Sequence, residues 1–374
     1  MFDLTKAAEQ DKAFIDGVWE KLDKKLSVVA ERSRDKVPYT TENGTHINNH
    51  NISWWTNGFW PGLMWLMYYG TKNDTYKQTA ERTEELLDEA LEGFFGLHHD
   101  VGFMWHISAG VNYRITGNEK SKVRTMYAAS TLAARYNLNA KIIRAWNSDP
   151  CVAIIDCMMN IPLLYRESVY SKDDRFKNIA VAHANMAMCD HIRPDGSVHH
   201  IVRHDPQTGE VLENIGGQGY GVGSSWSRGQ AWAIYGFVLS YIHTGYEEYL
   251  DAAKSVAHYF IANAATTDYL PLCDFRAPDE PVYYDSTAAV CTACGLIEIA
   301  RCVPEYEKKM YIDAAMKLLM AAEKEWCNWD DNEDSVLQMG TEAYYNGIHM
   351  PIIYGDFFLA EALLKLKGEE FLMW

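Results

Sequence analysis

The segment Tyr68-Tyr69-Gly70-Thr71-Lys72-Asn73-Asp74-Thr75-Tyr76 joins an apolar stretch of the sequence to an amphipathic one. Gly and Asn are typical of a turn between two helices, and an aromatic residue follows early in the second stretch. The pattern returns before Phe176, before Tyr249 and before Tyr311, and a fainter copy at 113–118 places Val123 at the matching position. The sequence therefore predicts a repeated pair of helices, and strand signals are scarce.

The spacing of these positions sets the size of the repeat. Four steps from residue 76 to residue 311 correspond to about 59 residues per unit, which fits two helices and their connections. Because 374 residues hold six such units, we expect an all-α fold: one domain over residues 1–374, built as a closed ring of six inner and six outer helices. An open solenoid of helix pairs is the alternative. The inner helices, apolar on most faces, should cover about 55–70, 100–116, 151–166, 224–242, 285–302 and 354–367, after a first helix at about 4–32.

The predicted inner helices begin with residues unlike their apolar bodies. The starts carry Trp54, Trp55 and Trp60; His98, His99 and Asp100; Asp156; Trp226 and Arg228; Tyr283, Tyr284 and Asp285; and His349, Tyr354 and Asp356. In a closed ring these starts meet at one end. We therefore expect the active cleft at that end.

A Gly-rich segment, residues 217–223, leads directly into the predicted helix that carries Arg228 and Trp232. These two residues are four apart, so the guanidinium and the indole should share one helix face. Such a pair suits a sugar with a carboxylate, because the ring can stack on Trp while Arg binds the acid. An Arg packed on a Trp for structural reasons alone is the alternative. The upstream run 199–204, with three His and one Arg, favours a binding site.

Two acids are candidates for catalysis. Asp156 is surrounded by apolar residues and thiols, so we expect burial to raise its pKa and keep it protonated as a general acid. Asn160, one turn further on, is placed to hydrogen-bond it or its neighbourhood. Asp100 follows two histidines and precedes Trp105. A buried Asp satisfied by backbone amides, or a plain helix cap, remains the structural alternative for each.

Composition excludes several classes of protein. The net charge of −17 argues against nucleic acid or an anionic membrane surface as a partner. No segment has the pattern of a signal peptide or a membrane span, so we expect a cytoplasmic protein. Its eight cysteines should then be reduced core thiols. Cys291 and Cys294 form a lone CxxC without a nearby His, which disfavours zinc.

Three motifs together resemble one known family. They are His99-Asp100-Val101-Gly102-Phe103, Ile155-Asp156-Cys157-Met158-Met159-Asn160 and Trp226-Ser227-Arg228-Gly229-Gln230-Ala231-Trp232, which are similar to those of glycoside hydrolase family 88, the unsaturated glucuronyl hydrolases. The resemblance runs from about Asn49 to the C-terminus. It implies an (α/α)6 barrel that removes 4,5-unsaturated glucuronic acid from the non-reducing end of lyase-generated oligosaccharides.

The resemblance also implies roles for individual residues. Asp156 corresponds to the general acid/base and Asp100 to a second essential acid that contacts the ring hydroxyls. The chemistry implied is hydration of the C4=C5 vinyl ether, with no metal or organic cofactor. Residues that resemble substrate-contacting positions are Trp54, His99, Trp146, His200, Gln218, Trp226, Arg228 and Trp232, with His349 at the cleft rim.

Two other functions stay open at this stage. An unsaturated rhamnogalacturonyl hydrolase would share the barrel and the chemistry, although the motif at 228–232 resembles the glucuronyl group better. A helical ring that binds sugars without catalysis would use Trp and Arg equally well, but it has no use for an acid such as Asp156. Because the loop 345–356 contains neither Ser nor Lys, we expect a preference for unsulfated disaccharides.

Overall fold

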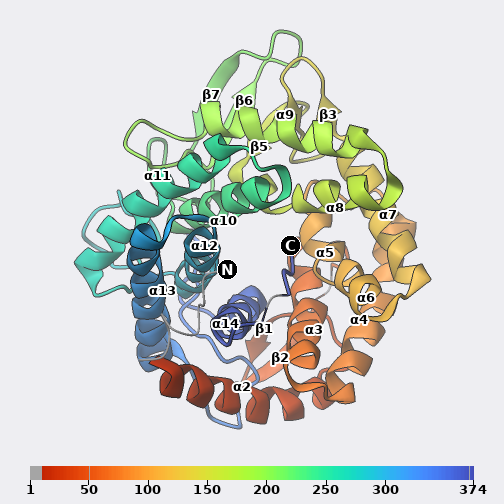
Figure 1. Cartoon of the computed structure of the whole chain (residues 1–374), viewed down its shortest axis with the longest axis vertical. Coiled ribbons are helices and arrows are strands. Elements are labelled where there is room, and N and C mark those ends of the chain that lie inside the picture. The colour runs from red at the N-terminus through yellow and green to blue at the C-terminus, as the bar shows by residue number, and fades with distance from the viewer. Residues whose placement is uncertain (1–10, 50, 370) are drawn as a thin grey trace.

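The computed structural model describes residues 11–49, 51–369 and 371–374, and over these residues the helices form the expected closed ring (Figure 1). The inner helices are α3 (Phe59–Thr71), α5 (Val101–Trp105) with α6 (Ala109–Thr116), α8 (Pro162–Ser171), α10 (Ser227–Thr244), α12 (Ser286–Cys302) and α14 (Ile353–Leu366). The outer helices are α4 (Asp74–Gly93), α7 (Glu119–Ala134), α9 (Asp174–Asp190), α11 (Glu247–Ala264), α13 (Glu305–Trp326) and α2 (Lys12–Arg32). Residues 4–10 of the predicted first helix lie outside the described residues.

Three turns from inner to outer helices, those before α4, α7 and α9, share one local structure. The first helix ends on a residue in the left-handed conformation, such as Lys72 (φ 60°) after α3 or Gly117 (φ 75°) after α6. The next residue, Asn73 or Asn118, caps the following helix with its side chain. Such a cap satisfies backbone N–H groups that have no partner within the helix. The turn after α10 keeps the left-handed residue, Gly245, without a side-chain cap, and α12 ends at the extended Val303, so this turn accounts for only part of the repeat.

One predicted member of the repeat is wrong. Tyr76 and Phe176 are buried at the third positions of their outer helices, but Val123 is 48% exposed. The third position of α7 is Ser121, which is buried and donates a hydrogen bond to Glu84 of α4. A polar contact between outer helices thus replaces the aromatic residue there.

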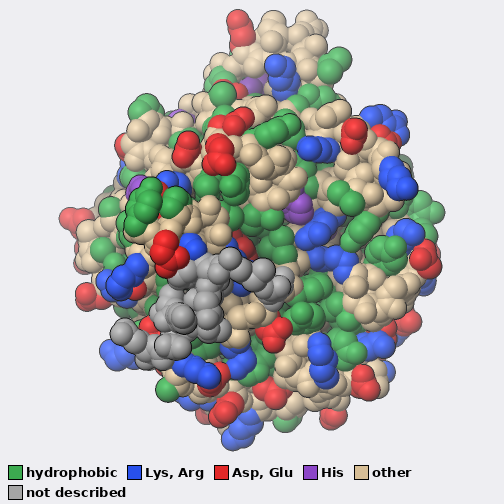
Figure 2. All heavy atoms as spheres, viewed as in Figure 1, with side chains coloured by type: hydrophobic (Ala, Val, Ile, Leu, Met, Phe, Trp, Pro, Cys, Tyr) green, Lys and Arg blue, Asp and Glu red, His purple; other side chains and the backbone are tan. Residues whose placement is uncertain are grey.

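The ring closes because α14 packs against α3, and α10, α12 and α14 bury most or all of their side chains. Figure 2 shows one end of the ring, with hydrophobic side chains gathered round the central hollow and charges of both signs round the perimeter. Trp374 fills part of the interior, where its ring stacks on Phe358 at 6.2 Å between centroids.

Two predicted inner helices are interrupted. The helix expected at 100–116 breaks between α5 and α6, where the Ser108 hydroxyl donates to the carbonyl of Met104 at 2.5 Å and competes with helical bonding. The stretch expected as a helix at 151–166 begins as strand β5 (Val152–Ile154), continues as the 3-10 segment η3 (Ile155–Met159) and becomes helical only at Pro162. β-branched residues favour the strand, and Pro is well suited to the first turn of a helix.

The strands form three small antiparallel sheets. They pair β1 (Pro38–Glu42) with β2 (Thr45–Asn48), β3 (Tyr136–Asn137) with β4 (Ile142–Ile143), and β5 with β6 (Ile201–His204) and β7 (Val211–Ile215). The pairing of Ile154 with Ile201, extended by a bond from the Ile155 amide to the His200 carbonyl, brings His200 beside Asp156. This sheet therefore assembles part of the site.

The cysteines differ in how deeply they are buried. Five of the eight thiols are buried, but Cys302 and Cys327 are only partly buried and Cys189 is exposed, so the prediction that all are core thiols is wrong. Among the described residues, each helix is too short or too polar to cross a bilayer.

Candidate active site

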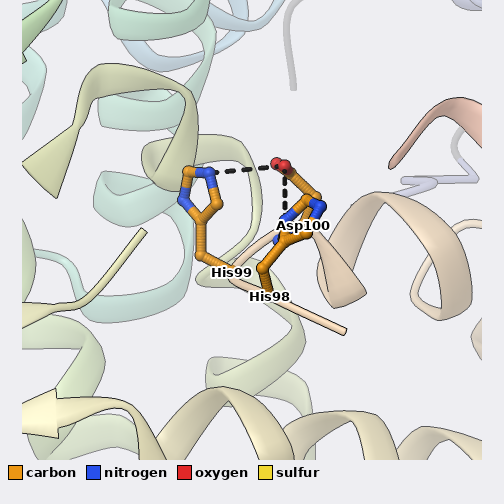
Figure 3. A group of neighbouring side chains, drawn as sticks. All are labelled: His98, His99 and Asp100. Carbon is orange, nitrogen blue, oxygen red and sulfur yellow. Dashed lines mark hydrogen bonds and ion pairs between the residues drawn. The ribbon is translucent and has the colours of Figure 1, made fainter. Parts of the chain in front are cut away.

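Asp100 lies at the start of α5, between two histidines of its own loop. Its Oδ2 is 3.1 Å from His98 Nδ1 and 3.3 Å from His99 Nε2 (Figure 3). Burial by itself would raise the pKa of Asp100, but the contacts with His99 and His98 outweigh it and hold that pKa well below its ordinary value. The side chain is therefore a carboxylate. These three residues could also approach one metal ion together, but here both imidazoles point directly at the carboxylate.

Asn160 connects Asp100 to the segment that carries Asp156. Its side-chain amide donates to Asp100 Oδ1 at 3.0 Å and to the Asp156 carbonyl at 3.3 Å, and its oxygen accepts from the Phe103 amide at 2.8 Å. The expectation that Asn160 bonds the neighbourhood of Asp156 is confirmed. Gly102 permits this contact, because a Cβ there would lie 2.6 Å from Asn160.

Asp156 is in η3, not in a helix as expected, and is 9% exposed among fully buried neighbours. Its Oδ1 faces His200 Nε2 at 3.4 Å. The other ring nitrogen, His200 Nδ1, accepts from the Gln218 amide at 3.0 Å. Because Nδ1 is the acceptor, a neutral His200 carries its proton on Nε2 and presents it to Asp156.

The Gly-rich segment determines this orientation of His200. Gly217 has a φ of 60°, and a Cβ on it would lie 2.1 Å from His200 Nδ1. The Gln218 side chain donates to the Glu342 carbonyl at 2.6 Å. The segment therefore connects the histidine to the loop before α14.

The tryptophans differ in their positions. Trp226 is 2% exposed and lies against His200, with ring centroids 4.3 Å apart. Trp54 precedes the 3-10 segment η2 (Trp55–Gly58) and meets Tyr39 edge-on at 6.0 Å. Trp146, in the loop after β4, is 38% exposed. Trp54 and Trp146 thus offer partly exposed rings, whereas Trp226 backs the histidine.

Arg228 and Trp232 do not form the expected pair. The guanidinium lies over Trp226 and Tyr354, at 4.5 and 5.4 Å from the ring centres. It is fully buried, donating to Asp285 at 2.8 Å and to the carbonyls of Thr341 and Glu342 at 2.5 Å each. Both Nη atoms are thus hydrogen-bonded to the protein, whereas Nε has no hydrogen-bond partner. The geometry favours a supporting role.

Trp232 is also fully buried, among Phe103, Tyr354 and Phe358 of the barrel interior. His349 lies in the loop before α14, where its Nε2 accepts from the Tyr284 amide at 3.0 Å. Burial lowers the pKa of His349. Both residues are therefore engaged with the protein itself in this structure.

Several buried polar atoms in this region lack a hydrogen-bond partner. They include Asp156 Oδ1, His200 Nε2, His99 Nδ1, Trp226 Nε1 and Trp54 Nε1. Buried polar groups are normally satisfied, so a group of unsatisfied ones marks a place for a polar ligand. The convergence of the inner-helix starts is confirmed: Trp55 of η2, for instance, contacts Phe103 and Tyr354.

A cavity of about 900 Å³ lies elsewhere, between outer helices α4 and α7. Its lining includes Leu91, Phe94, Tyr127 and Asn147, and it contains none of the candidate site residues named above. This cavity is therefore separate from the candidate active site.

The sequence placed His98 and Asp285 among the helix starts at the expected cleft but gave them no role, and it did not point to Tyr39 or Glu342. Asp285 caps α12 and pairs with Arg228. Burial raises the pKa of the Tyr39 hydroxyl, and the Glu342 carboxylate, to which it is hydrogen-bonded, raises it further. Tyr39 and Glu342 are so far apart in the chain that no local pattern could connect them. For His98, its place beside His99 was an available signal.

The ring of helix pairs, with two linked acids and several tryptophans at one end, defines a helical-barrel glycosidase. No protein-family model matches the chain, but individual proteins do. It is 35% identical to the unsaturated glucuronyl hydrolase of Bacillus sp. (strain GL1), over 89% of this chain and 91% of that protein. It is 31% identical to the unsaturated chondroitin disaccharide hydrolase of Streptococcus pyogenes serotype M1, over 88% and 84%.

Solved structures agree with this relationship. The unsaturated glucuronyl hydrolase from Streptococcus agalactiae superposes with a TM-score of 0.89 at 29% identity, covering 96% of this chain and 93% of that one. The chain therefore belongs to the unsaturated glucuronyl hydrolases, and the expected (α/α)6 barrel is confirmed.

Proposed function

We propose that this enzyme releases 4,5-unsaturated glucuronic acid from the non-reducing end of lyase-generated oligosaccharides. Relatives of known structure were solved with dGlcA-Glc-Rha-Glc and with dGlcA-GalNAc6S. The observation that carries the proposal is the pair of acids, Asp100 and Asp156, linked through Asn160 beside buried polar atoms without partners.

The proposed reaction hydrates the vinyl ether. Asp156 donates a proton to C4, and the oxygen of a water molecule adds to C5 as its proton passes to the Asp156 carboxylate. The hemiketal then opens and expels the remaining sugar. Asp100 contacts the ring hydroxyls, and Trp54, Trp146, His99 and His200 form the proposed substrate surface, with Gln218 and Trp226 behind His200. Arg228, Trp232 and His349 support these groups.

The test is turnover of unsaturated disaccharides, followed as loss of the ultraviolet absorbance of the conjugated alkene. Asp156→Asn and Asp100→Asn preserve volume, and each should reduce the rate on the order of 10²- to 10⁴-fold while the protein stays folded. A folded Asp156→Asn enzyme with near wild-type turnover would exclude Asp156 as the proton donor. If the wild type acts only on unsaturated rhamnogalacturonan products, the rhamnogalacturonyl alternative holds. If it binds sugars without any turnover, it is a sugar-binding ring.

The loop before α14 suggests a preference among substrates. Residues 345–351 present Ile348, Met350 and Pro351 but no Ser or Lys, so a sulfate there would lose water without gaining donors. We expect a higher kcat/KM for an unsulfated disaccharide than for its matched sulfated form. Equal or faster turnover of the sulfated form would show that this loop does not set the preference.

A further inference from the structure

His98 stands next to the proposed catalytic residues without an assigned role. It lies in the loop before α5, and its side chain is 24% exposed, against 3% for His99. Figure 3 shows both imidazoles directed at the Asp100 carboxylate from different sides. His98 Nδ1 lies 3.1 Å from Oδ2 and 3.5 Å from the backbone amide of Asp100. The contact with the carboxylate is the shorter of the two, and an ionised carboxylate only accepts hydrogen bonds, so this contact requires the proton on Nδ1, which donates to Oδ2.

The bond from His98 completes a three-point hold on Asp100. His99 approaches the same Oδ2 at 3.3 Å, and Asn160 donates to Oδ1 at 3.0 Å. His99 and Asn160 are buried, so of the three partners only His98 reaches solvent. Without His98, Oδ2 would retain the longer contact alone, and the carboxylate could turn about its bond to Cβ.

We propose that His98 is a positioning residue, whose Nδ1–H fixes the orientation in which the Asp100 carboxylate meets the sugar ring. This inference rests on the proposed function, because it gives His98 its effect through Asp100. A positioning role should appear mainly in kcat, since a misdirected carboxylate still lets the sugar bind but no longer supports the transition state.

The experiment compares two replacements of His98. The His98→Leu side chain fills similar space and donates no hydrogen bond. We expect this variant to lower kcat about 10- to 100-fold with little change in KM. The His98→Asn variant places a side-chain amide near the position of Nδ1 and so keeps a hydrogen-bond donor there. Its kcat should lie within about threefold of wild type. His258→Asn, on outer helix α11, is the matched control; His258 bonds Tyr311 and lies outside the site.

Full activity of folded His98→Leu would overturn the proposal, as would an Asn variant no better than Leu. Loss of folding in the Leu variant leaves the Asn comparison, where a kcat far below wild type in a folded protein also refutes it. The Asp100→Asn variant separates a failure of the proposed function from a failure of the role proposed for His98. If that variant stays active, the proposed role of Asp100 fails; if it is inactive while His98→Leu is fully active, only the role of His98 fails.

Discussion

The absence of one methyl group at Gly217 controls how His200 faces Asp156. The left-handed backbone at Gly217 lets the next amide donate to His200 Nδ1, and the ring nitrogen lies where a Cβ would be. That amide bond assigns the proton of a neutral imidazole to Nε2, on the side of Asp156. A backbone conformation thus fixes which ring nitrogen of His200 lies opposite the acid.

Gly217→Ala should therefore lower kcat/KM by about tenfold or more, because the left-handed conformation costs about 1–2 kcal/mol and the new Cβ displaces His200. Steady-state kinetics on an unsaturated disaccharide provides the measurement. Gly221→Ala is the control, since it lies in the same loop and nothing lies within 4 Å of its Cβ position. Equal rates for the two variants would contradict the assigned orientation of His200.

Among the elements, α10 and α12 are joined at the mouth of the barrel by the buried pair of Arg228 and Asp285. Arg228 also holds the carbonyls of Thr341 and Glu342, and Gln218 donates to the latter. Two loops that are more than a hundred residues apart are thereby fixed to each other. The pair links these loops to the starts of α10 and α12, and both of its side chains are fully buried.

Asp285→Asn should lower the free energy of unfolding by about 3–5 kcal/mol, because it leaves the buried Arg228 charge without its partner. It should also reduce kcat/KM, although Asp285 is fully buried. Urea denaturation and kinetics measure the two effects, with exposed Asp279→Asn as the control. An Arg228→Gln variant that only raises KM, at unchanged stability, would instead show that Arg228 binds the uronate directly.

At the scale of the whole molecule, the closed ring buries several histidines that carry no role in the proposed reaction. Burial lowers the pKa of His191 to about 4 and that of His243 to about 3, both below the ordinary value of 6.5. As the pH falls below 6.5, the unfolded chain binds protons that the folded chain does not. Stability is therefore lost as the pH falls from 6.5 towards 4. Burial acts in the opposite direction on Glu84, whose pKa it raises to about 7.

The contribution of one histidine can be isolated at His191, whose Nδ1 donates to the His199 carbonyl at 2.8 Å. The His191→Asn variant can keep the hydrogen bond to the His199 carbonyl, and its side chain does not titrate. Between pH 6.5 and pH 4.5 its free energy of unfolding should fall less steeply than that of the wild type, by about 1.4 kcal/mol per pH unit. Thermal melts across this range measure the difference, and parallel pH dependences for the two proteins would refute it.

The features of this protein that could be predicted from its sequence are those that depend on local structure. The turn with a left-handed residue and an Asn or Asp cap recurs in the first half of the chain. The spacing of the repeat and the chain length together predicted the six helix pairs. The motifs at 99–103 and 155–160 made Asp100 and Asp156 the candidate acids, since each motif is a short contiguous run. Propensity also favoured a strand at 152–154, but the apolar run there was assigned to a helix.

Ring closure and packing set which of the site side chains bind other parts of the protein and which keep buried polar atoms without a partner. Arg228 and Trp232 lie four residues apart on one helix, yet the guanidinium is taken by Asp285 and by two carbonyls of a distant loop. His200 reaches Asp156 because β5 pairs with β6. Such contacts join residues tens to hundreds of positions apart, and they arise from ring closure and packing. The periodic pattern of the sequence therefore cannot predict these contacts.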